Sequence, residues 1–281
     1  MAFVALDKEA LSKAGFTDVI EPRQGSAVIA LAGIEGTGKT TWALTGPKPL
    51  LYQGTDFGTD GIIQKADGQI IRPKGGDYKI EIPFEYRAFV DRKETDKERQ
   101  VREGRLANFV HEKFYVPFYE DFIKGLDAGV RTVVWDSASE IWEFIRLSVF
   151  GRTGTNRPDL NAEANAKFRE LVRMANVRNV NLIMINHLKK RFDSYFDASG
   201  NVKWRPTNEW TMEGNDKCPR LVAMNLWTEF TPGDALTGTD PVFNLKVKKN
   251  RDHAEYVGQT LPALPFIELM GLLVPEVDEW E

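Results

Sequence analysis

Gly33-Ile34-Glu35-Gly36-Thr37-Gly38-Lys39-Thr40-Thr41 follows directly on the apolar run Ala27-Val28-Ile29-Ala30-Leu31-Ala32. A short apolar run bounded by glycine indicates a buried strand, and the stretch after it matches the complete pattern G-x-x-x-x-G-K-[ST]. In such a loop consecutive backbone N–H groups turn toward one anionic ligand, because glycine permits the positive φ angles that this turn requires. We therefore predict a strand, a phosphate-binding loop and a helix, with residues 33–41 as the nucleotide-binding residues.

Each residue type in this loop suits one part of a nucleoside triphosphate. Lys39 places a positive charge at the β- and γ-phosphates, and Thr40 offers a hydroxyl to Mg²⁺. Thr41 then lies in the first turn of the helix. The predicted cofactors are ATP and Mg²⁺, and the alternative is a glycine-rich turn with a surface lysine.

Composition limits the classes of protein that remain. The chain has 281 residues, of which 42% are hydrophobic and 28% are charged, which is typical of a globular protein. Its formal net charge is −4, so any contact with nucleic acid needs a local basic patch. The single cysteine, Cys218, excludes an internal disulfide, and neither a signal peptide nor an apolar run of membrane-spanning length is present. We expect a soluble protein of the cytoplasm.

Two acidic residues follow predicted strands. Residues 49–53 form an apolar strand that leads to Asp56, and residues 131–136 form a buried strand that ends in Asp136. Ligands of open α/β sheets lie beyond the carboxyl ends of the strands, so Asp56 is a candidate for meeting the γ-phosphate or its attacking water. The alternative is that Asp56 only stabilises a turn. Asp136 suits the Walker B role, in which its carboxylate holds the Mg²⁺ bound to Thr40. Glu140, one turn into the next helix, is a second candidate for the base that activates water.

A further strand, 180–185, ends at the polar pair Asn186-His187. At the end of a buried strand these side chains could sense whether the γ-phosphate is present. The alternative is that they only satisfy local backbone groups.

Basic and aromatic residues alternate with one another over residues 188–205. Cations that neutralise phosphates, together with rings on which bases stack, are typical of a sequence-tolerant single-strand surface. The alternative is a β-hairpin, turning at 198–201, that packs the rings. A flexible loop at 151–158 carries two more arginines. The candidate DNA-binding residues are Arg152, Arg157, Lys189, Lys190, Arg191, Lys203 and Arg205.

Other segments receive broader interpretations. The alternation over 61–90 predicts a β-hairpin insertion, and the nearly balanced charges of 91–105 predict a solvated helix or loop. Strands are predicted at 221–230 and 242–247. The cations after the second of these could act on a nucleotide bound to the next subunit, touch DNA backbone or protect an edge strand. They are Lys248, Lys249 and Arg251.

The order of these features resembles the RecA-like ATPase core, most closely that of compact bacteriophage proteins that promote single-strand annealing. The resemblance spans roughly residues 20–270. It implies an α/β fold with a mostly parallel central sheet flanked by helices, to which the pattern adds β-hairpin insertions. It also implies ATP at subunit interfaces, a ring or filament of identical subunits, and catalytic or sensor roles for Asp56, Asn186 and His187. Asp56 would stand where such proteins place a glutamate.

We divide the chain into an N-terminal segment (1–25), a RecA-like domain (26–270, with an insertion at about 62–110) and an acidic tail (271–281). The tail could bind a single-strand-binding or other replication protein. The predicted function is an ATP-dependent, single-stranded-DNA-binding ATPase of recombination or annealing in a bacterial host cell. Two alternatives stay open: a P-loop kinase for a small molecule, and a nucleotide-gated assembly module with negligible hydrolysis.

Overall fold

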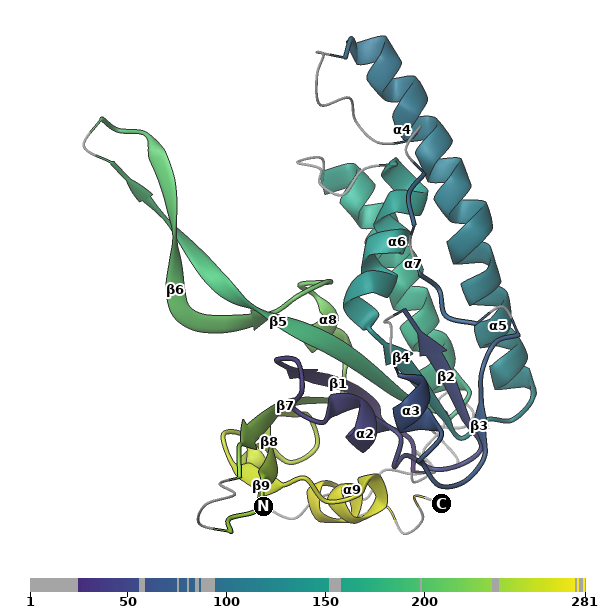
Figure 1. The fold of residues 1–281 in the computed structure, drawn as a ribbon, viewed down its shortest axis with the longest axis vertical. Helices are drawn as coiled ribbons and strands as arrows, with labels where there is room; N and C mark the ends of the chain where they lie inside the picture. Colours follow the sequence, from purple (N-terminus) through teal and green to yellow (C-terminus); the bar gives the residue numbers. More distant parts are fainter. Residues whose placement is uncertain are drawn as a thin grey trace, which may run out of the picture.

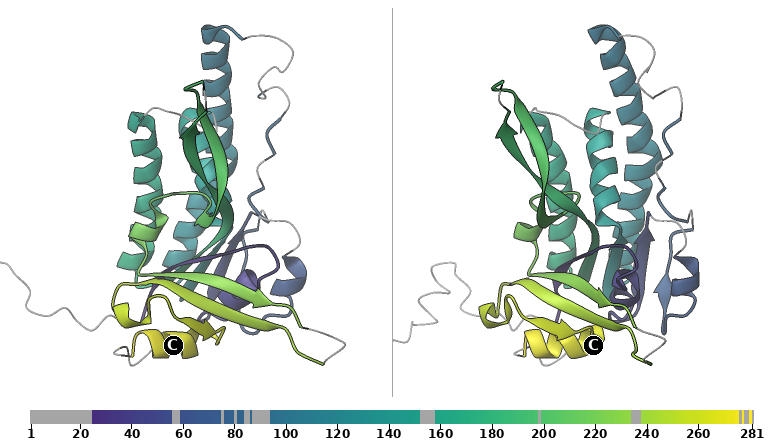
Figure 2. Two further views of the ribbon diagram at one scale, coloured as in Figure 1. Left: turned by 90° about the vertical axis from the view of Figure 1, so that its left-hand side faces the viewer. Right: turned by 60° about the vertical axis from the view of Figure 1, so that its left-hand side comes forward.

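The computed structural model describes residues 25–55, 59–74, 76–79, 81–83, 86, 94–151, 158–197, 199–233, 238–275, 277 and 280. Within these ranges the chain forms one twisted sheet with helices on both faces (Figures 1 and 2). The strands are β1 (Val28–Gly33), β2 (Leu50–Gly54), β3 (Ile70–Ile71), β4 (Thr132–Asp136), β5 (Asn181–Phe196), β6 (Val202–Met212), β7 (Met224–Thr231), β8 (Val242–Asn250) and β9 (Thr260–Pro262). The helices are α2 (Lys39–Ala43), α3 (Asp60–Ile63), α4 (Asp96–Val110), α5 (Val116–Asp127), α6 (Ala138–Phe150), α7 (Pro158–Val177), α8 (Cys218–Leu221) and α9 (Phe266–Leu273), with a π-helical turn η2 (His111–Tyr115) between α4 and α5 and a 3₁₀ turn η3 (Ala254–Tyr256).

The strand order is β3-β2-β4-β5-β1-β7-β8-β9, and β6 pairs only with β5. In this order, neighbouring strands from β3 through β2, β4, β5 and β1 to β7 are parallel. The last two strands, β8 and β9, each pair antiparallel with the strand before them. The predicted α/β class, with a mostly parallel sheet, flanking helices and hairpins, is confirmed. Because β1 lies at the centre between β5 and β7, the loop that follows it is surrounded by the carboxyl ends of its neighbours.

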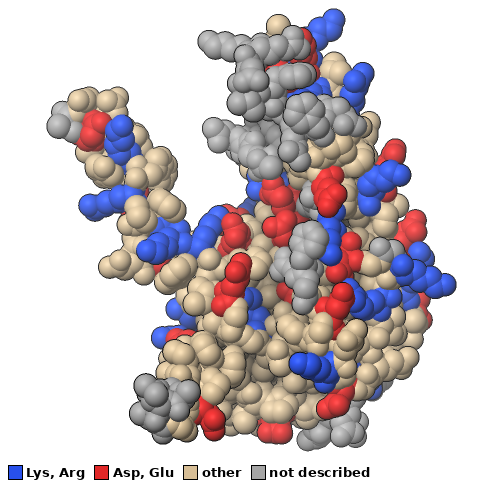
Figure 3. Space-filling view, viewed as in Figure 1, with Lys and Arg blue, Asp and Glu red and all other residues tan. Residues whose placement is uncertain are grey.

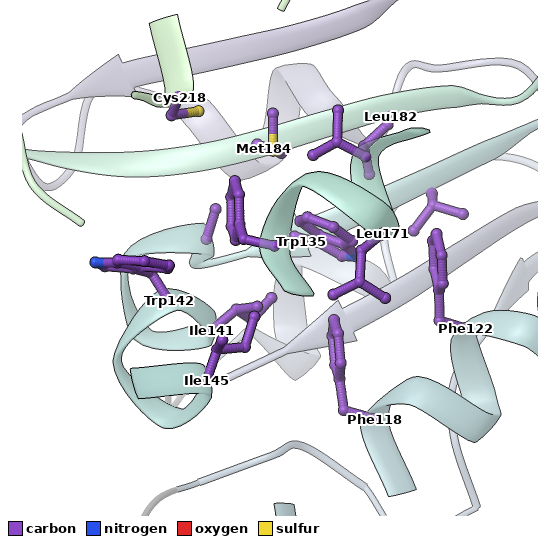
Figure 4. Packing of buried hydrophobic residues seen from close by; sticks show 14 of the residues in the cluster. Phe118, Phe122, Trp135, Ile141, Trp142, Ile145, Leu171, Leu182, Met184 and Cys218 are labelled. Carbon is purple, nitrogen blue, oxygen red and sulfur yellow. The ribbon is translucent and has the colours of Figure 1, made fainter. Parts of the chain in front are cut away.

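Alternating side chains of the buried strands divide the core into two layers. One layer packs under α5, α6 and α7, where the ring of Trp135 meets Phe118, Phe122 and Phe168 (Figure 4). The other layer packs under α2 and α9 and includes Ile29 and Phe266. Phe118 and Phe122 are fully buried in the first of these layers.

Several predicted boundaries were wrong. The β-hairpin insertion is not present among the described residues of 61–86: β3 joins the main sheet, and Tyr78 packs its ring on Phe118 instead of pairing in a hairpin. The predicted strand at 221–230 begins at Met224 because Cys218–Leu221 is the short helix α8. Within the predicted acidic tail, Trp280 is buried against Phe266, so this residue belongs to the core.

The charged stretch 91–105 is helical where it is described. Thr95 and Glu98 form a reciprocal capping box at the start of α4, which satisfies two backbone N–H groups that the helix cannot. The bounds of α4 show that the helix continues well beyond residue 105, and η2 and α5 follow it directly (Figure 1). Among the described helices, none is long and apolar enough to cross a membrane.

The strand predicted at 180–185 is much longer than expected. Its first half is buried between β1 and β4, and its second half leaves the body with β6 as a two-stranded arm (Figures 1 and 2). The turn of this arm falls at 197–201, where the Asp197 side chain accepts hydrogen bonds from the backbone N–H groups of Ser199 and Asn201, at 2.9 Å each. The predicted hairpin turn is confirmed. We call the ribbon from Leu188 to Met212 the arm.

Candidate functional site

The loop between β1 and α2 adopts the backbone conformation that its glycines predict. Gly36 and Gly38 have φ angles of 74° and 78°, a region that other residues adopt rarely. The Lys39 ammonium donates to the carbonyl oxygens of Gly33 at 3.0 Å and Ile34 at 2.7 Å, and the residue is 7% exposed. The loop therefore folds around the cation that a phosphate would meet.

A hydroxyl pair joins this loop to the neighbouring strand β7. The Thr37 and Thr228 hydroxyl oxygens are hydrogen-bonded to each other at 2.6 Å, and each also lies within hydrogen-bonding distance of a backbone carbonyl, that of Ile34 at 2.7 Å for Thr37 and that of Ala32 at 3.3 Å for Thr228. A Cβ on Gly33 would lie 1.9 Å from the Thr228 hydroxyl oxygen. Gly33 is thus required for the close approach of the loop to β7, a role that the motif alone does not show.

The two residues predicted to hold Mg²⁺ meet. The Thr40 hydroxyl donates to Asp136 Oδ2 at 2.6 Å, and the Tyr52 hydroxyl donates to the same oxygen at 2.9 Å. Asp136 is 2% exposed, and Tyr52 is fully buried. Burial, followed by the charge of Asp136, raises the pKa of Tyr52, which therefore stays protonated and fixes the orientation of the carboxylate.

These oxygens fit Mg²⁺. The ion prefers oxygen ligands and commonly takes only one or two from the protein beside substrate phosphates. Within the described ranges no three His, Cys, Asp or Glu side chains gather to form a metal site. Thr40 and Asp136 would hold the ion, which would neutralise phosphate charge.

The segment after Asp136 is hydrogen-bonded to Thr55, the residue after β2, and then begins α6. The Ser137 N–H donates to the Thr55 hydroxyl at 2.8 Å, and the Ser137 hydroxyl accepts from the Glu140 N–H at 3.3 Å as the cap of α6. Glu140 is exposed in the first turn. Nearby, burial raises the pKa of the Glu143 carboxyl; Glu140 and Glu213 act in the same direction and Arg146 opposes them.

The predicted sensor pair lies at the level of the phosphate loop, with Ala32 opposite Asn186 and Gly33 opposite His187. The Asn186 amide donates to the Met184 carbonyl at 2.8 Å and is almost fully buried. This contact is the local one considered as the alternative for Asn186. The sensor role of both residues stays a prediction. Asp56, Arg152 and Arg157 lie outside the described residues.

Pairing within the arm sorts the residues that the sequence interleaves. Directly opposed residues share a face, so Phe192, Phe196, Val202 and Trp204 lie on one face, and Asp193, Tyr195, Lys203 and Arg205 lie on the other. The four apolar side chains are 53–75% exposed. The Arg205 guanidinium lies 5.5 Å from the centre of the Tyr195 ring, and Arg191 pairs with Glu209 at 2.8 Å. Lys189 and Lys190 are at the base of the arm.

Three cations, Lys248, Lys249 and Arg251, follow the strand predicted at 242–247. Because β8 runs antiparallel to β7, they lie near the ends of the strands that are opposite to the phosphate loop. Lys249 donates to the carbonyls of Pro219 and Val222, both at 2.7 Å, and Arg251 donates to the carbonyls of Arg220 and Val222. Lys248 lies 4.4 Å above the Trp227 ring. They cannot reach the loop of their own chain, so their role toward another subunit stays a prediction.

Sequence reasoning missed Tyr52, Thr228 and Ser139. The Ser139 hydroxyl is hydrogen-bonded to His187 and Glu213, the two residues that flank the arm. Each is a common residue within a strand or helix, distant in sequence from its partner; Tyr52 is 84 residues from Asp136 and Thr228 is 191 from Thr37. The only available signal was the position of Tyr52 near the carboxyl end of a predicted strand.

With this geometry the fold and site define a P-loop NTPase. The chain belongs to the AAA_24 family of AAA domains, whose model matches residues 26–226, and as a P-loop NTPase it binds nucleotide. Among solved structures, the chain is similar to the KaiC-like protein PH0186 from Pyrococcus horikoshii OT3, at 12% identity, 84% coverage of each chain and a TM-score of 0.39. A search of curated proteins found no match.

Proposed function

We propose that this P-loop NTPase is an ATP- and Mg²⁺-dependent ATPase that binds single-stranded DNA along its arm and acts in phage-type recombination or strand annealing. The observation that carries the proposal is the continuity of β5. Its buried half pairs residue by residue with β1, which leads into the phosphate loop, and its other half is the arm. The candidate nucleotide site therefore lies next to the point of β5 at which the arm begins.

The two faces of the arm suit an unpaired strand. Bases stack on aromatic rings without regard to sequence, and Trp204, Phe196 and Phe192 present such rings on one uncovered face. Lysine and arginine side chains are long enough to reach phosphates from the edges of a thin ribbon. In the space-filling view the arm stands clear of the body, and both Lys or Arg side chains (blue) and Asp or Glu side chains (red) lie among its other residues (Figure 3).

Trp204→Ala is expected to weaken binding of single-stranded DNA by about 5- to 150-fold, because one stacked base contributes roughly 1–3 kcal/mol. Fluorescence anisotropy with a labelled oligonucleotide measures the change. Lys203→Gln should instead lower the slope of affinity against salt by about 0.7. Val177→Ala, which removes an equally exposed apolar side chain from α7, is the control. If Trp204→Ala binds the oligonucleotide with native affinity, the proposal that the arm binds single-stranded DNA is wrong.

ATP hydrolysis with and without single-stranded DNA separates the proposal from its alternatives. Stimulation by the strand supports the proposed function. A small-molecule kinase would hydrolyse at the same rate with or without the strand, and an assembly module would show negligible hydrolysis in both. An RNA strand used in parallel tells which nucleic acid is preferred.

We place the nucleoside in a hollow of about 1010 Å³ beside α2. Thr41, directly after Lys39 and Thr40, lines it together with Leu44, Ile62 and Pro265. Ligand pockets of this size, mostly apolar with few polar groups, suit a flat aromatic base. Thr41 is the member of residues 33–41 that lines the hollow, so the base and the phosphates would meet at this residue.

We also infer that identical chains assemble head to tail. An exposed apolar patch formed by Ile34, Phe230, Val242 and Phe243 borders the phosphate loop, since a Cβ on Gly38 would lie 3.0 Å from the Phe243 ring. A neighbour docked there would bring its own far edge, with Lys248 and Arg251, toward the bound nucleotide. Contacts between unlike surfaces generate rings or filaments.

Sedimentation velocity tests the assembly. The native protein should gain mass when ATP and Mg²⁺ are added, and Phe243→Glu should prevent the gain because it places a charge in the apolar contact. A monomer under every condition would contradict the inference.

A further inference from the structure

The root of the arm is bonded to the helix that follows Asp136. Ser139, the second residue of α6, is 6% exposed. Its hydroxyl accepts from the His187 N–H at 3.3 Å and donates to the Glu213 carbonyl at 3.2 Å. The Glu213 N–H in turn donates to the His187 carbonyl at 2.8 Å. One hydroxyl thus contacts both strands of the arm at the point where they leave the body.

A glycine makes this contact possible. Gly214 has a φ of 95°, and a Cβ there would lie 3.0 Å from the Ser139 Cα. Any larger residue at 214 would push the end of β6 away from α6 and would also be strained by the positive φ. The close approach of Glu213 to Ser139 therefore depends on Gly214.

The other end of the connection is the nucleotide site. Ser139 is three residues from Asp136, whose carboxylate accepts from Thr40 in the phosphate loop. Between them, Ser137 is hydrogen-bonded to Thr55, the residue after β2, and caps α6. A shift of this carboxylate on binding of nucleotide and Mg²⁺ would reach the start of α6, and the Ser139 hydroxyl is one polar contact of that helix turn with His187 and Glu213.

We propose that Ser139 is the positioning residue that couples the nucleotide site to the arm, through its hydrogen bonds to His187 and Glu213. The inference rests on the proposed function for the identity of the nucleotide and deepens it by naming the connection. Ser139 lies on α6, outside both the phosphate loop at 33–41 and the arm. Its contribution is the coupling between the two sites, which in proteins commonly amounts to about 5- to 150-fold in affinity.

The experiment measures the arm directly and needs no DNA. Spin labels are attached at Ser199→Cys in the arm turn and at Arg173→Cys on the exposed surface of α7. Cys218 is 1% exposed and burial raises the pKa of its thiol to about 12, so it does not compete for the label. In the otherwise native protein, ATP with Mg²⁺ should change the distribution of distances between the labels.

Ser139→Ala should bind ATP with native affinity but lose this change, because the arm no longer follows the start of α6. Gly214→Ala is a second, independent variant with the same expected loss. Ser148→Ala is the matched control, since Ser148 is a buried serine of the same helix whose hydroxyl bonds only the Ile145 carbonyl, at 2.8 Å. It should respond to ATP as the native protein does, and thermal unfolding of all variants confirms that they are folded.

Two outcomes overturn the inference: a native response in Ser139→Ala, or a native arm that does not respond although ATP is bound. Binding of a labelled oligonucleotide to the same samples distinguishes a failure of the coupling through Ser139 from a failure of the proposed DNA binding. If the arm responds through Ser139 but no strand binds, the coupling stands and the DNA-binding function fails. If the strand binds and its affinity depends on ATP equally in Ser139→Ala and native protein, the DNA-binding function stands and the coupling fails.

Discussion

Lys39→Ala is expected to lower the affinity for ATP and Mg²⁺ by about 100-fold or more, equivalent to roughly 2.7 kcal/mol. The Lys39 ammonium lies between the carbonyls of Gly33 and Ile34, inside the loop that would surround the phosphates. Its removal takes away the point charge that meets the β- and γ-phosphates. It also leaves the loop without the donor that orders its first two carbonyls. Isothermal titration calorimetry measures the loss.

Two further variants make this result specific. Lys39→Arg keeps the charge but replaces a compact ammonium by a planar group, so only partial recovery is expected. Lys124→Ala removes a solvent-exposed lysine of α5 that pairs with Glu120, and it should bind ATP as the native chain does. The proposed function further requires that Lys39→Ala abolish any stimulation of DNA binding by nucleotide. If Lys39→Ala binds ATP within threefold of native, the assignment of this loop as the phosphate site is wrong.

Gly33→Ala is expected to destabilise the protein by about 1–3 kcal/mol, the usual cost of overpacking a buried site, and to weaken nucleotide binding. The added Cβ would lie 1.9 Å from the Thr228 hydroxyl oxygen and 2.8 Å from that of Thr37. The start of the phosphate loop must then move away from β7, and the hydroxyl pair between Thr37 and Thr228 is disrupted. Chemical denaturation and calorimetry with ATP measure the two effects.

A double variant tests the stated cause. In Gly33→Ala with Thr228→Ala the hydroxyl is gone and the nearest atom left at residue 228 is its Cβ, at 3.2 Å, so both stability and ATP affinity should recover in part. Gly104→Ala is the control, because its Cβ would meet nothing within 4 Å and alanine favours the helix α4. If the double variant is no better than Gly33→Ala, the clash with β7 is not the reason for the glycine.

The backbone of the candidate phosphate site could be predicted from the sequence because that part of the site is local. Residues 33–41 are consecutive, and their backbone conformation is determined by glycines at fixed positions. Asp136 could be predicted as well, since an acid at the end of an apolar strand lies at the same edge of a parallel sheet as the loop after β1. Even without a ligand, Thr40 and Asp136 lie within hydrogen-bonding distance.

The arm was predicted in part. The turn at 197–201 carries local signals, and it forms where expected. The sequence could not show that β5 is one strand from the core to the arm, because a buried segment and an exposed segment have different patterns. The sequence also could not show which face of the arm carries the aromatic rings and which carries the cations. This depends on which residues of β6 stand opposite those of β5.

By itself, the sequence determined the phosphate loop, the class of the fold and the acid that faces the loop, because each is a pattern of neighbouring residues or of strand ends. Only the tertiary structure decided that Tyr52 orients Asp136, that Thr228 contacts the loop and that Ser139 bonds both strands of the arm. The physical reason is that these contacts join single hydroxyl groups across 48 to 191 residues of chain. Such partners are selected by the order and register of the strands, which no local pattern encodes.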